Sequence, residues 1–280
     1  MTASTKEHYK GYPNPAHIVS VDEATTLVGK SAVVFVDTRN YWKYIKGHIP
    51  GAVNLELFAF HWVDTSARGL QAFANEMSML LGSLGIDEET EVIFYQNNSG
   101  YDAARGVWLL EFLGNRKGRM LDGGLNLWKR RRMELSTQDE EFAGKKFTAR
   151  VDQSVASTLE EVERHVNRRD ATVIDARNPG EYSGEYRRAL KLGHIPVSIN
   201  IEWKRALRRD GTLKDARQLA RLYGDIPKDG RVVTYCQSGY RAAHTRLVLG
   251  LLGYSNVGNY PGSWYEWGNV ESTSTESGKA

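Results

Sequence analysis

One cysteine occurs in the 280 residues, and its neighbours could make its sulfur a nucleophile. Cys236 follows a short apolar run at residues 232–235. The residues after it read Gln-Ser-Gly-Tyr-Arg, and an apolar-periodic stretch then begins. This order predicts a strand, a tight loop and a helix. The N–H groups of the loop and the positive end of the helix would face the sulfur, with Arg241 five positions on. These surroundings favour the thiolate, so we interpret Cys236 as reactive rather than as a small buried hydrophobic residue.

The composition is that of a soluble globular protein, because 41% of the residues are hydrophobic, 25% are charged and the net charge is +3. A charge this small gives no argument for nucleic-acid binding, and no apolar run approaches the ~20 residues that span a bilayer. The polar residues 1–14 lack the apolar core of a signal peptide. A single cysteine cannot form an internal disulfide, which fits a reducing compartment. We therefore expect a cytoplasmic protein without membrane or nucleic-acid partners.

The chain contains one series of motifs twice, at an offset near 140 residues. The recurring pairs are Asp37-Thr38-Arg39 with Asp175-Ala176-Arg177, Gly47-His48-Ile49-Pro50 with Gly193-His194-Ile195-Pro196, residues 92–95 with 232–235, and Trp128 with Trp267. A repeat this long indicates a duplicated domain rather than a short solenoid unit. We place the two domains at residues 1–140 and 141–280, joined by a polar stretch at residues 138–152.

Helical and strand patterns alternate within each half. In the first half, apolar residues at helical spacing from 70 to 84 precede an apolar strand at 92–95 and a helix at 103–113. The second half repeats this plan with a helix near 213–223, the strand at 232–235 and a helix at 242–252. Thr158 and Glu161 have the spacing of a capping box. The alternation predicts two α/β domains, each an open, mainly parallel sheet flanked by helices. Ligands of such sheets lie beyond the carboxyl ends of strands, as Cys236 does.

These motifs, in this order and duplicated, resemble the tandem-domain rhodanese family of sulfurtransferases. The resemblance covers nearly the whole chain, including a Gly-Ser-Trp-x-x-Trp ending at residues 262–267. It implies a five-stranded parallel core in each domain and a catalytic C-terminal domain. It also implies a structural N-terminal domain without the cysteine. Gln96 stands in the first copy where Cys236 stands in the second, and an amide cannot take up sulfur.

The resemblance implies a two-step transfer through a persulfide on Cys236, with no metal or organic cofactor. A thiolate would take the outer sulfur of thiosulfate, and cyanide or a thiol would accept it. The partners are thus a small-molecule sulfur donor and acceptor. The expected substrate-binding residues are Arg241, Gln237, Ser238, Gly239, Tyr240 and Arg187. Arg241 would hold the anionic donor, and the loop N–H groups would hold the persulfide.

The sulfur donor distinguishes mercaptopyruvate sulfurtransferases from thiosulfate sulfurtransferases. Mercaptopyruvate sulfurtransferases carry an arginine after the Asp-x-Arg motif that holds the substrate carboxylate. Here that element reads Gly180-Glu181-Tyr182, and Glu181 would repel a carboxylate. Bacterial thiosulfate enzymes, whose loop begins Cys-Gln and ends in arginine, resemble this loop more closely. We therefore expect thiosulfate, with 3-mercaptopyruvate as the alternative. Either Arg187 or its neighbour Arg188 would match a second family arginine.

Two other functions use similar chemistry. Phosphatases of this fold need five residues between cysteine and arginine, whereas four separate Cys236 from Arg241, so the loop is too tight for phosphate. A persulfide carrier that delivers sulfur to a protein partner shares the chemistry of the enzyme, and the sequence does not separate the two.

The other conspicuous residues have structural interpretations. We expect His48 and His194 to be satisfied turn histidines rather than metal ligands, because neither has a second ligand at metal-binding spacing. The Asp-x-Arg pairs would form internal charged hydrogen bonds, and Trp264 and Trp267 would pack at the domain interface or the pocket rather than serve as a cofactor platform. Val197-Ser198 replaces the Gly51-Ala52 of the first copy, and the sequence offers no reason for this change.

Overall fold

Two parallel sheets organise the chain in the computed structural model, which describes residues 9–140 and 142–278. The first sheet has the order β1-β5-β4-β2-β3 and the second the order β7-β6-β8-β9. In chain order, the strands are β1 Ile18–Val19, β2 Val33–Asp37, β3 Ala52–Asn54, β4 Glu91–Tyr95, β5 Gly118–Leu121, β6 Ala171–Asp175, β7 Ile199–Asn200, β8 Arg231–Tyr235 and β9 Val257–Asn259. Each half therefore has the predicted open parallel sheet.

Helices flank both sheets, as the alternating pattern predicts. They are α1 Val21–Thr25, α2 Tyr41–Tyr44, α3 Ala67–Ser83, α4 Tyr101–Phe112, α5 Gly124–Arg130, α6 Leu159–Arg168, α7 Pro179–Ser183, α8 Ala216–Tyr223, α9 Tyr240–Leu251 and α10 Ser263–Trp267. Four short 3-10 helices, η1 Tyr9–Gly11, η2 Leu57–Phe60, η3 Gln153–Val155 and η4 Trp203–Ala206, lie in the connections. The predicted helices at 70–84, 103–113, 213–223 and 242–252 correspond to α3, α4, α8 and α9.

Two local predictions were only half right. A fifth strand was expected in each sheet, but the edge of the second sheet is a single parallel bridge between Ala156 and Asn259. Thr158 does cap α6, since its side chain accepts from the Glu161 N–H at 3.1 Å. The Glu161 carboxylate does not complete the capping box. It instead accepts hydrogen bonds from Arg231 at the start of β8, at 2.8 and 3.2 Å.

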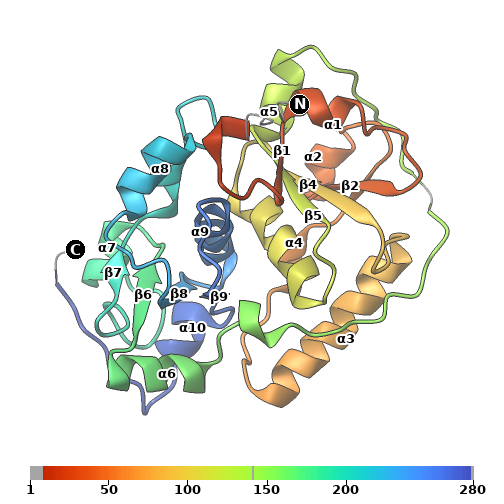
Figure 1. Cartoon of the computed structure of the whole chain (residues 1–280). Coiled ribbons are helices and arrows are strands. Elements are labelled where there is room, and N and C mark those ends of the chain that lie inside the picture. Colours follow the sequence, from red (N-terminus) through yellow and green to blue (C-terminus); the bar gives the residue numbers. More distant parts are fainter. Residues whose placement is uncertain (1–8, 141, 279–280) are drawn as a thin grey trace, which may run out of the picture.

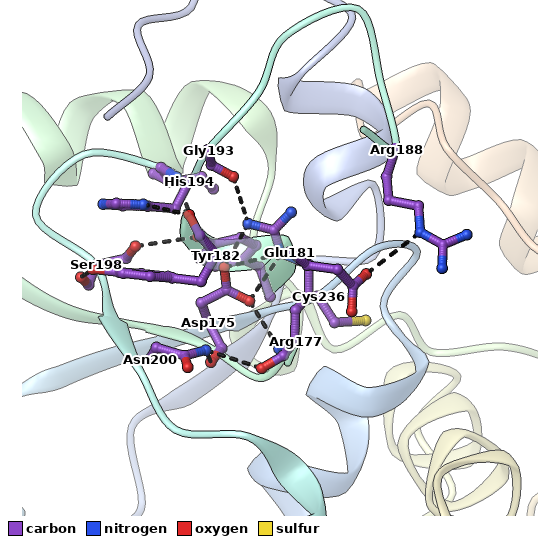
Figure 2. Close-up of polar contacts among 12 residues, drawn as sticks. Asp175, Arg177, Glu181, Tyr182, Arg188, Gly193, His194, Ser198, Asn200 and Cys236 are labelled. Carbon is purple, nitrogen blue, oxygen red and sulfur yellow. Dashed lines mark hydrogen bonds and ion pairs between the residues drawn. The ribbon is translucent and has the colours of Figure 1, made fainter. Parts of the chain in front are cut away.

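The Asp-x-Arg motifs form the internal charged contacts expected of them. The Arg177 guanidinium donates to both Asp175 oxygens and to the Gly193 carbonyl at 2.8 Å, and all three of these groups are buried. Asn200 fixes the same turn from β7 by donating to the Asp175 and Arg177 carbonyls. Figure 2 shows this network beneath the Cys236 loop. The first copy repeats it with Asp37, Arg39, Gly47 and Asn54. The duplicated motifs therefore build duplicated structure.

The backbone of the turn after each Gly-His-Ile-Pro motif shows why valine is an unusual residue at position 197. Gly51 in the first copy has φ +75°, and Val197 at the matching place has φ +60°. This left-handed region suits glycine, whereas a β-branched residue is strained there by about 1–2 kcal/mol. Ser198 has a clearer use, because its hydroxyl lies 3.1 Å from the Tyr235 hydroxyl.

Helices α4 and α9 pack against each other between the two sheets and join the halves (Figure 1). One hydrophobic cluster runs through both halves. Tyr240 at the start of α9 donates to the Leu57 carbonyl at 2.7 Å, and Arg246 forms a partly buried ion pair with Glu111 of α4. The loop containing Cys236 is therefore positioned by the first half as well as by its own sheet.

The stretch between the halves contributes no helix or strand of its own from residue 131 to 152, the undescribed residue 141 aside. It runs along the first half, where Ser136 pairs with His48 and the Arg150 N–H bonds to the Leu113 carbonyl. Within the described residues, none of the helices combines the length and the apolar character that crossing a membrane requires.

Candidate active site

Cys236 lies at the carboxyl end of β8, where it is 1% exposed. Its N–H donates to the Ser263 hydroxyl at 3.0 Å, and its carbonyl accepts from the Trp264 N–H at 3.0 Å. The Tyr265 N–H bonds to the Gln237 carbonyl at 2.9 Å. The start of α10 thus fixes the backbone on both sides of the sulfur. Sequence reasoning missed Ser263, although the Gly-Ser-Trp motif that contains it was visible.

The loop after Cys236 presents unused hydrogen-bond donors. Among the described residues, none accepts from the N–H groups of Gln237, Ser238, Gly239 or Tyr240. Gly239 has φ +79° and caps α9, and no side chain occupies the amino end of that 12-residue helix. A Cβ at Gly239 would lie 2.8 Å from the Pro261 backbone, so only glycine fits. Free N–H groups at a helix start stabilise a neighbouring anion.

A cavity of about 610 Å³ opens onto the sulfur and receives residues from both halves. Its lining consists of Glu56, Phe58, Tyr101, Asp102, Asn178, Glu181, Arg188, Glu202, Trp203, Lys204, Cys236, Gln237, Ser238, Tyr240 and Arg241. Carboxylates and aromatic rings are as prominent here as cations. The sequence predicted the loop residues but none of the groups that η2 and α4 of the first half supply.

Arg241 is paired with a carboxylate of the same cavity. Its two terminal nitrogens donate to the two Glu181 oxygens at 2.6 and 2.9 Å. The Glu181 side chain is 3% exposed. Burial pushes the pKa of Glu181 upwards, but the bonds and charge of Arg241 outweigh it and leave that pKa below its usual value. Glu181 is therefore the counter-ion of Arg241, a role that the sequence did not predict.

Of the two neighbouring arginines, Arg188 rather than Arg187 lines the cavity. Its guanidinium lines the cavity and lies 4.0 Å from Glu181, whereas Arg187 donates to the Leu190 carbonyl at 2.7 Å and is not part of the lining. Figure 2 shows Arg188 reaching toward Glu181 beside the Cys236 sulfur. Arg187, predicted to bind substrate, thus lies outside the cavity, and the loop between α7 and β7 carries the neighbouring arginine into it.

Asp102 is a cavity group that the sequence gave no reason to choose. It lies in the first turn of α4, at the place in the first half that Arg241 occupies in α9. Burial, reinforced by the charge of Glu56 and opposed by Lys43, raises the pKa of Asp102 to about 7. Its carboxyl group therefore changes charge near neutral pH while facing the same cavity as Cys236.

The matching loop of the first half is closed by its own side chains. Gln96 accepts from the Asp102 N–H at 3.2 Å and donates to Asn98 at 3.0 Å. A Cβ at Gly100 would lie 1.8 Å from the Gln96 amide nitrogen, so the glutamine fills the space above the loop. This loop carries no thiol, and the Gln96 amide occupies the space beside Gly100.

The conspicuous histidines and tryptophans are structural. His194 stacks on Tyr182 with ring centroids 3.6 Å apart and bonds to its carbonyl, and His48 repeats this on Tyr44. Trp264 and Trp267 are each 1% exposed and belong to the core of the second half, rather than to the interface between the halves or the cavity lining. The described residues contain no group of three or more side chains that could hold a metal ion.

Comparison with known proteins decides the family. The profile of the rhodanese-like domain matches residues 20–131 and again residues 158–269. The chain belongs to the rhodanese-like family. A thiosulfate sulfurtransferase of Pseudomonas aeruginosa is 31% identical over 92% of this chain and 96% of its own length. A sulfur carrier protein, TtuD, of Thermus thermophilus is 33% identical over 93% and 96%. This rhodanese-like chain is a sulfurtransferase.

Solved structures agree on the fold. The anaerobic ergothioneine biosynthesis enzyme of Chlorobium limicola, in complex with trimethyl histidine, superposes with a TM-score of 0.83. The match covers 95% of this chain and 71% of the other at 21% identity. At that identity the likeness establishes the shared tandem α/β architecture and nothing about substrates.

Proposed function

We propose that this rhodanese-like protein transfers the outer sulfur of thiosulfate to cyanide or a thiol through a persulfide on Cys236. The observation that carries the proposal is the site of the sole cysteine. Cys236 lines a cavity, and the four N–H groups of the residues that follow it, at the start of α9, have no acceptor among the described residues. This arrangement suits a sulfur that is negatively charged in both of its working states.

The chemistry balances in two steps. The Cys236 thiolate attacks the outer sulfur of thiosulfate, a new S–S bond forms, and the old S–S bond breaks as sulfite leaves with the electron pair. Cyanide then attacks the terminal persulfide sulfur, so thiocyanate leaves and the thiolate returns. Arg188, Lys204 and Arg241 are the cations of the cavity lining that would attract the donor. The loop N–H groups would stabilise the persulfide between the two steps.

Thiosulfate rather than 3-mercaptopyruvate is the donor that the charges favour. A second arginine aligned on the substrate carboxylate would be needed for mercaptopyruvate, and Glu181 occupies that element while neutralising Arg241. The similarity to proteins named thiosulfate sulfurtransferase, at 31–32% identity, supports the same choice.

We assign the catalytic role to residues 141–280 and a structural role to residues 1–140. The filled loop around Gln96 supports this division. The first half nevertheless contributes one wall of the catalytic cavity through Glu56, Phe58, Tyr101 and Asp102.

A persulfide carrier for a protein partner is the second candidate. It is favoured by the size of the cavity, since about 610 Å³ exceeds what thiosulfate or cyanide fills. The similarity to a protein named sulfur carrier supports it as well.

Steady-state kinetics separate these functions. Thiosulfate and 3-mercaptopyruvate are compared as donors with cyanide as acceptor, and the thiosulfate reaction is repeated with small thiols. We expect a higher kcat/KM for thiosulfate. Faster turnover of mercaptopyruvate would overturn the donor assignment. A persulfide that forms but turns over with no small acceptor would favour the carrier.

A further inference from the structure

Arg105, in α4 of the first half, is a buried cation that lacks a counter-ion among the described residues. Its side chain belongs to a residue that is 2% exposed, and neither of its terminal nitrogens has a hydrogen-bond partner there. Its guanidinium lies 3.9 Å from the Trp108 ring centroid and 5.2 Å from that of Tyr240. Isolated buried charges are costly, so this arrangement calls for a compensating role.

The guanidinium lies directly behind the Cys236 loop. A Cβ built at Gly239 would come within 3.1 Å of Arg105 Nη1 and within 2.8 Å of the Pro261 backbone. Burial lowers the pKa of Arg105 to about 10, and the charges of Tyr240 and Cys236 oppose that shift. Arg105 therefore stays positively charged at neutral pH.

The other arginines near the loop are already neutralised. Arg241 forms its bidentate pair with Glu181, and Arg177 forms one with Asp175. Among the described residues, Tyr240 and Cys236 are the groups whose negative charge would favour the charged form of Arg105. Burial raises the pKa of Tyr240 to about 12, which leaves Cys236 as the candidate counter-charge.

We propose that Arg105 is a positioning residue of the active site, which holds negative charge on Cys236 from behind the loop. In this role the non-catalytic half supplies an electrostatic element of the catalytic half. The part of the proposal that concerns the persulfide rests on the proposed function, whereas the part that concerns the resting thiolate does not.

Other charged groups also act on this sulfur and must be held constant in a test. Tyr101 of α4, with Tyr240 and Arg241 of α9, interact electrostatically with Cys236. The remaining ionisable groups that line its cavity are Glu56, Asp102, Glu181, Arg188, Glu202 and Lys204. None of them is altered in the variants below.

The test is the pH profile of alkylation of the resting thiol by iodoacetamide in the full-length protein, without any sulfur donor. Arg105→Met keeps the length of the side chain among apolar neighbours and removes its charge. We expect the midpoint of the profile to rise by about one pH unit or more. Arg105→Lys should retain a large part of the original midpoint. The melting temperature of Arg105→Met should stay equal or rise, because a buried unpaired charge is removed.

Arg246→Met is the matched control. Arg246 is a half-buried arginine of α9 at the same interface, but it is paired with Glu111. Its loss should lower the melting temperature and leave the alkylation midpoint unchanged. An unchanged midpoint in Arg105→Met, or an equal shift in Arg246→Met, would overturn the proposal. If Arg105→Met does not fold, Arg105→Gln provides the same readout. Because no donor is present, a failure of sulfur transfer leaves this result interpretable.

Discussion

Replacing Arg241 by alanine should damage the donor step in two ways. The first is the loss of the contact to the thiosulfate anion. A charge-assisted contact is worth about 1.5–3 kcal/mol, which corresponds to roughly a 10- to 100-fold loss in kcat/KM. The second is the exposure of Glu181, whose carboxylate is now held by two bonds of 2.6 and 2.9 Å and is 3% exposed. An unpaired carboxylate in the cavity repels the donor, so we expect a total loss of about 10²–10³.

The same replacement should destabilise the fold. Removing one partner of a buried ion pair costs about 3–5 kcal/mol, because it leaves the other charge uncompensated. The pKa of Glu181 is depressed in the folded protein, so the pair contributes its full stability above the ordinary glutamate value. That stability is lost as the pH falls through the lowered value. The deficit of Arg241→Ala in urea unfolding should therefore be largest near neutral pH and should shrink in acid.

The double variant Glu181→Gln/Arg241→Ala separates the two effects. It removes the unpaired carboxylate, so we expect most of the lost stability to return and kcat/KM for thiosulfate to recover to the 10- to 100-fold deficit. Arg241→Lys should recover activity only in part, because an ammonium lacks the planar fork. Transfer from preformed persulfide to cyanide should suffer less than the donor step in every variant. Unchanged donor kinetics in Arg241→Ala would refute the assignment of Arg241 to the donor site.

Three further predictions follow from charged or strained residues. Asp102→Asn should raise kcat/KM for thiosulfate about three- to tenfold above pH 7, because the native carboxylate repels the donor there, and should change it little below pH 6. A ratio of variant to native kcat/KM that does not depend on pH would contradict this. Burial lowers the pKa of His244 to about 4, so the unfolded chain takes up a proton at a higher pH than the folded protein does. The free energy of unfolding of the native protein should therefore fall by about 2 kcal/mol between pH 7 and pH 5, and urea unfolding of His244→Gln should lack this loss. Val197→Gly should raise stability by about 1 kcal/mol, whereas Gly51→Val, its mirror in the first half, should lower it.

The sequence was sufficient for features that repeat or that follow strong patterns. The duplicated Asp-x-Arg and Gly-His-Ile-Pro motifs predicted two sheets of like topology, because the same residues make the same buried contacts in each copy. The apolar run before Cys236 predicted its position at the end of a central strand. Both predictions depend only on which residues follow one another along the chain.

Contacts between distant segments could not be predicted in this way. Nothing in the sequence around Arg241 indicates that Glu181, 60 positions away, would occupy its guanidinium. Asp102 and Arg105 reach the cavity and the loop only because α4 packs against α9, and that packing depends on the shapes of both halves. The single bridge at the edge of the second sheet could not be predicted either, because the family pattern does not specify how many residues pair at an edge.

The most direct test of the account is the intact mass of the protein after incubation with thiosulfate and removal of small molecules. We expect the mass of the native protein to increase by one sulfur atom and to return to its original value after cyanide is added. Cys236→Ser should gain nothing and should have no sulfurtransferase activity. Native protein that gains no sulfur, or a Cys236→Ser variant that gains as much, would contradict the persulfide on Cys236.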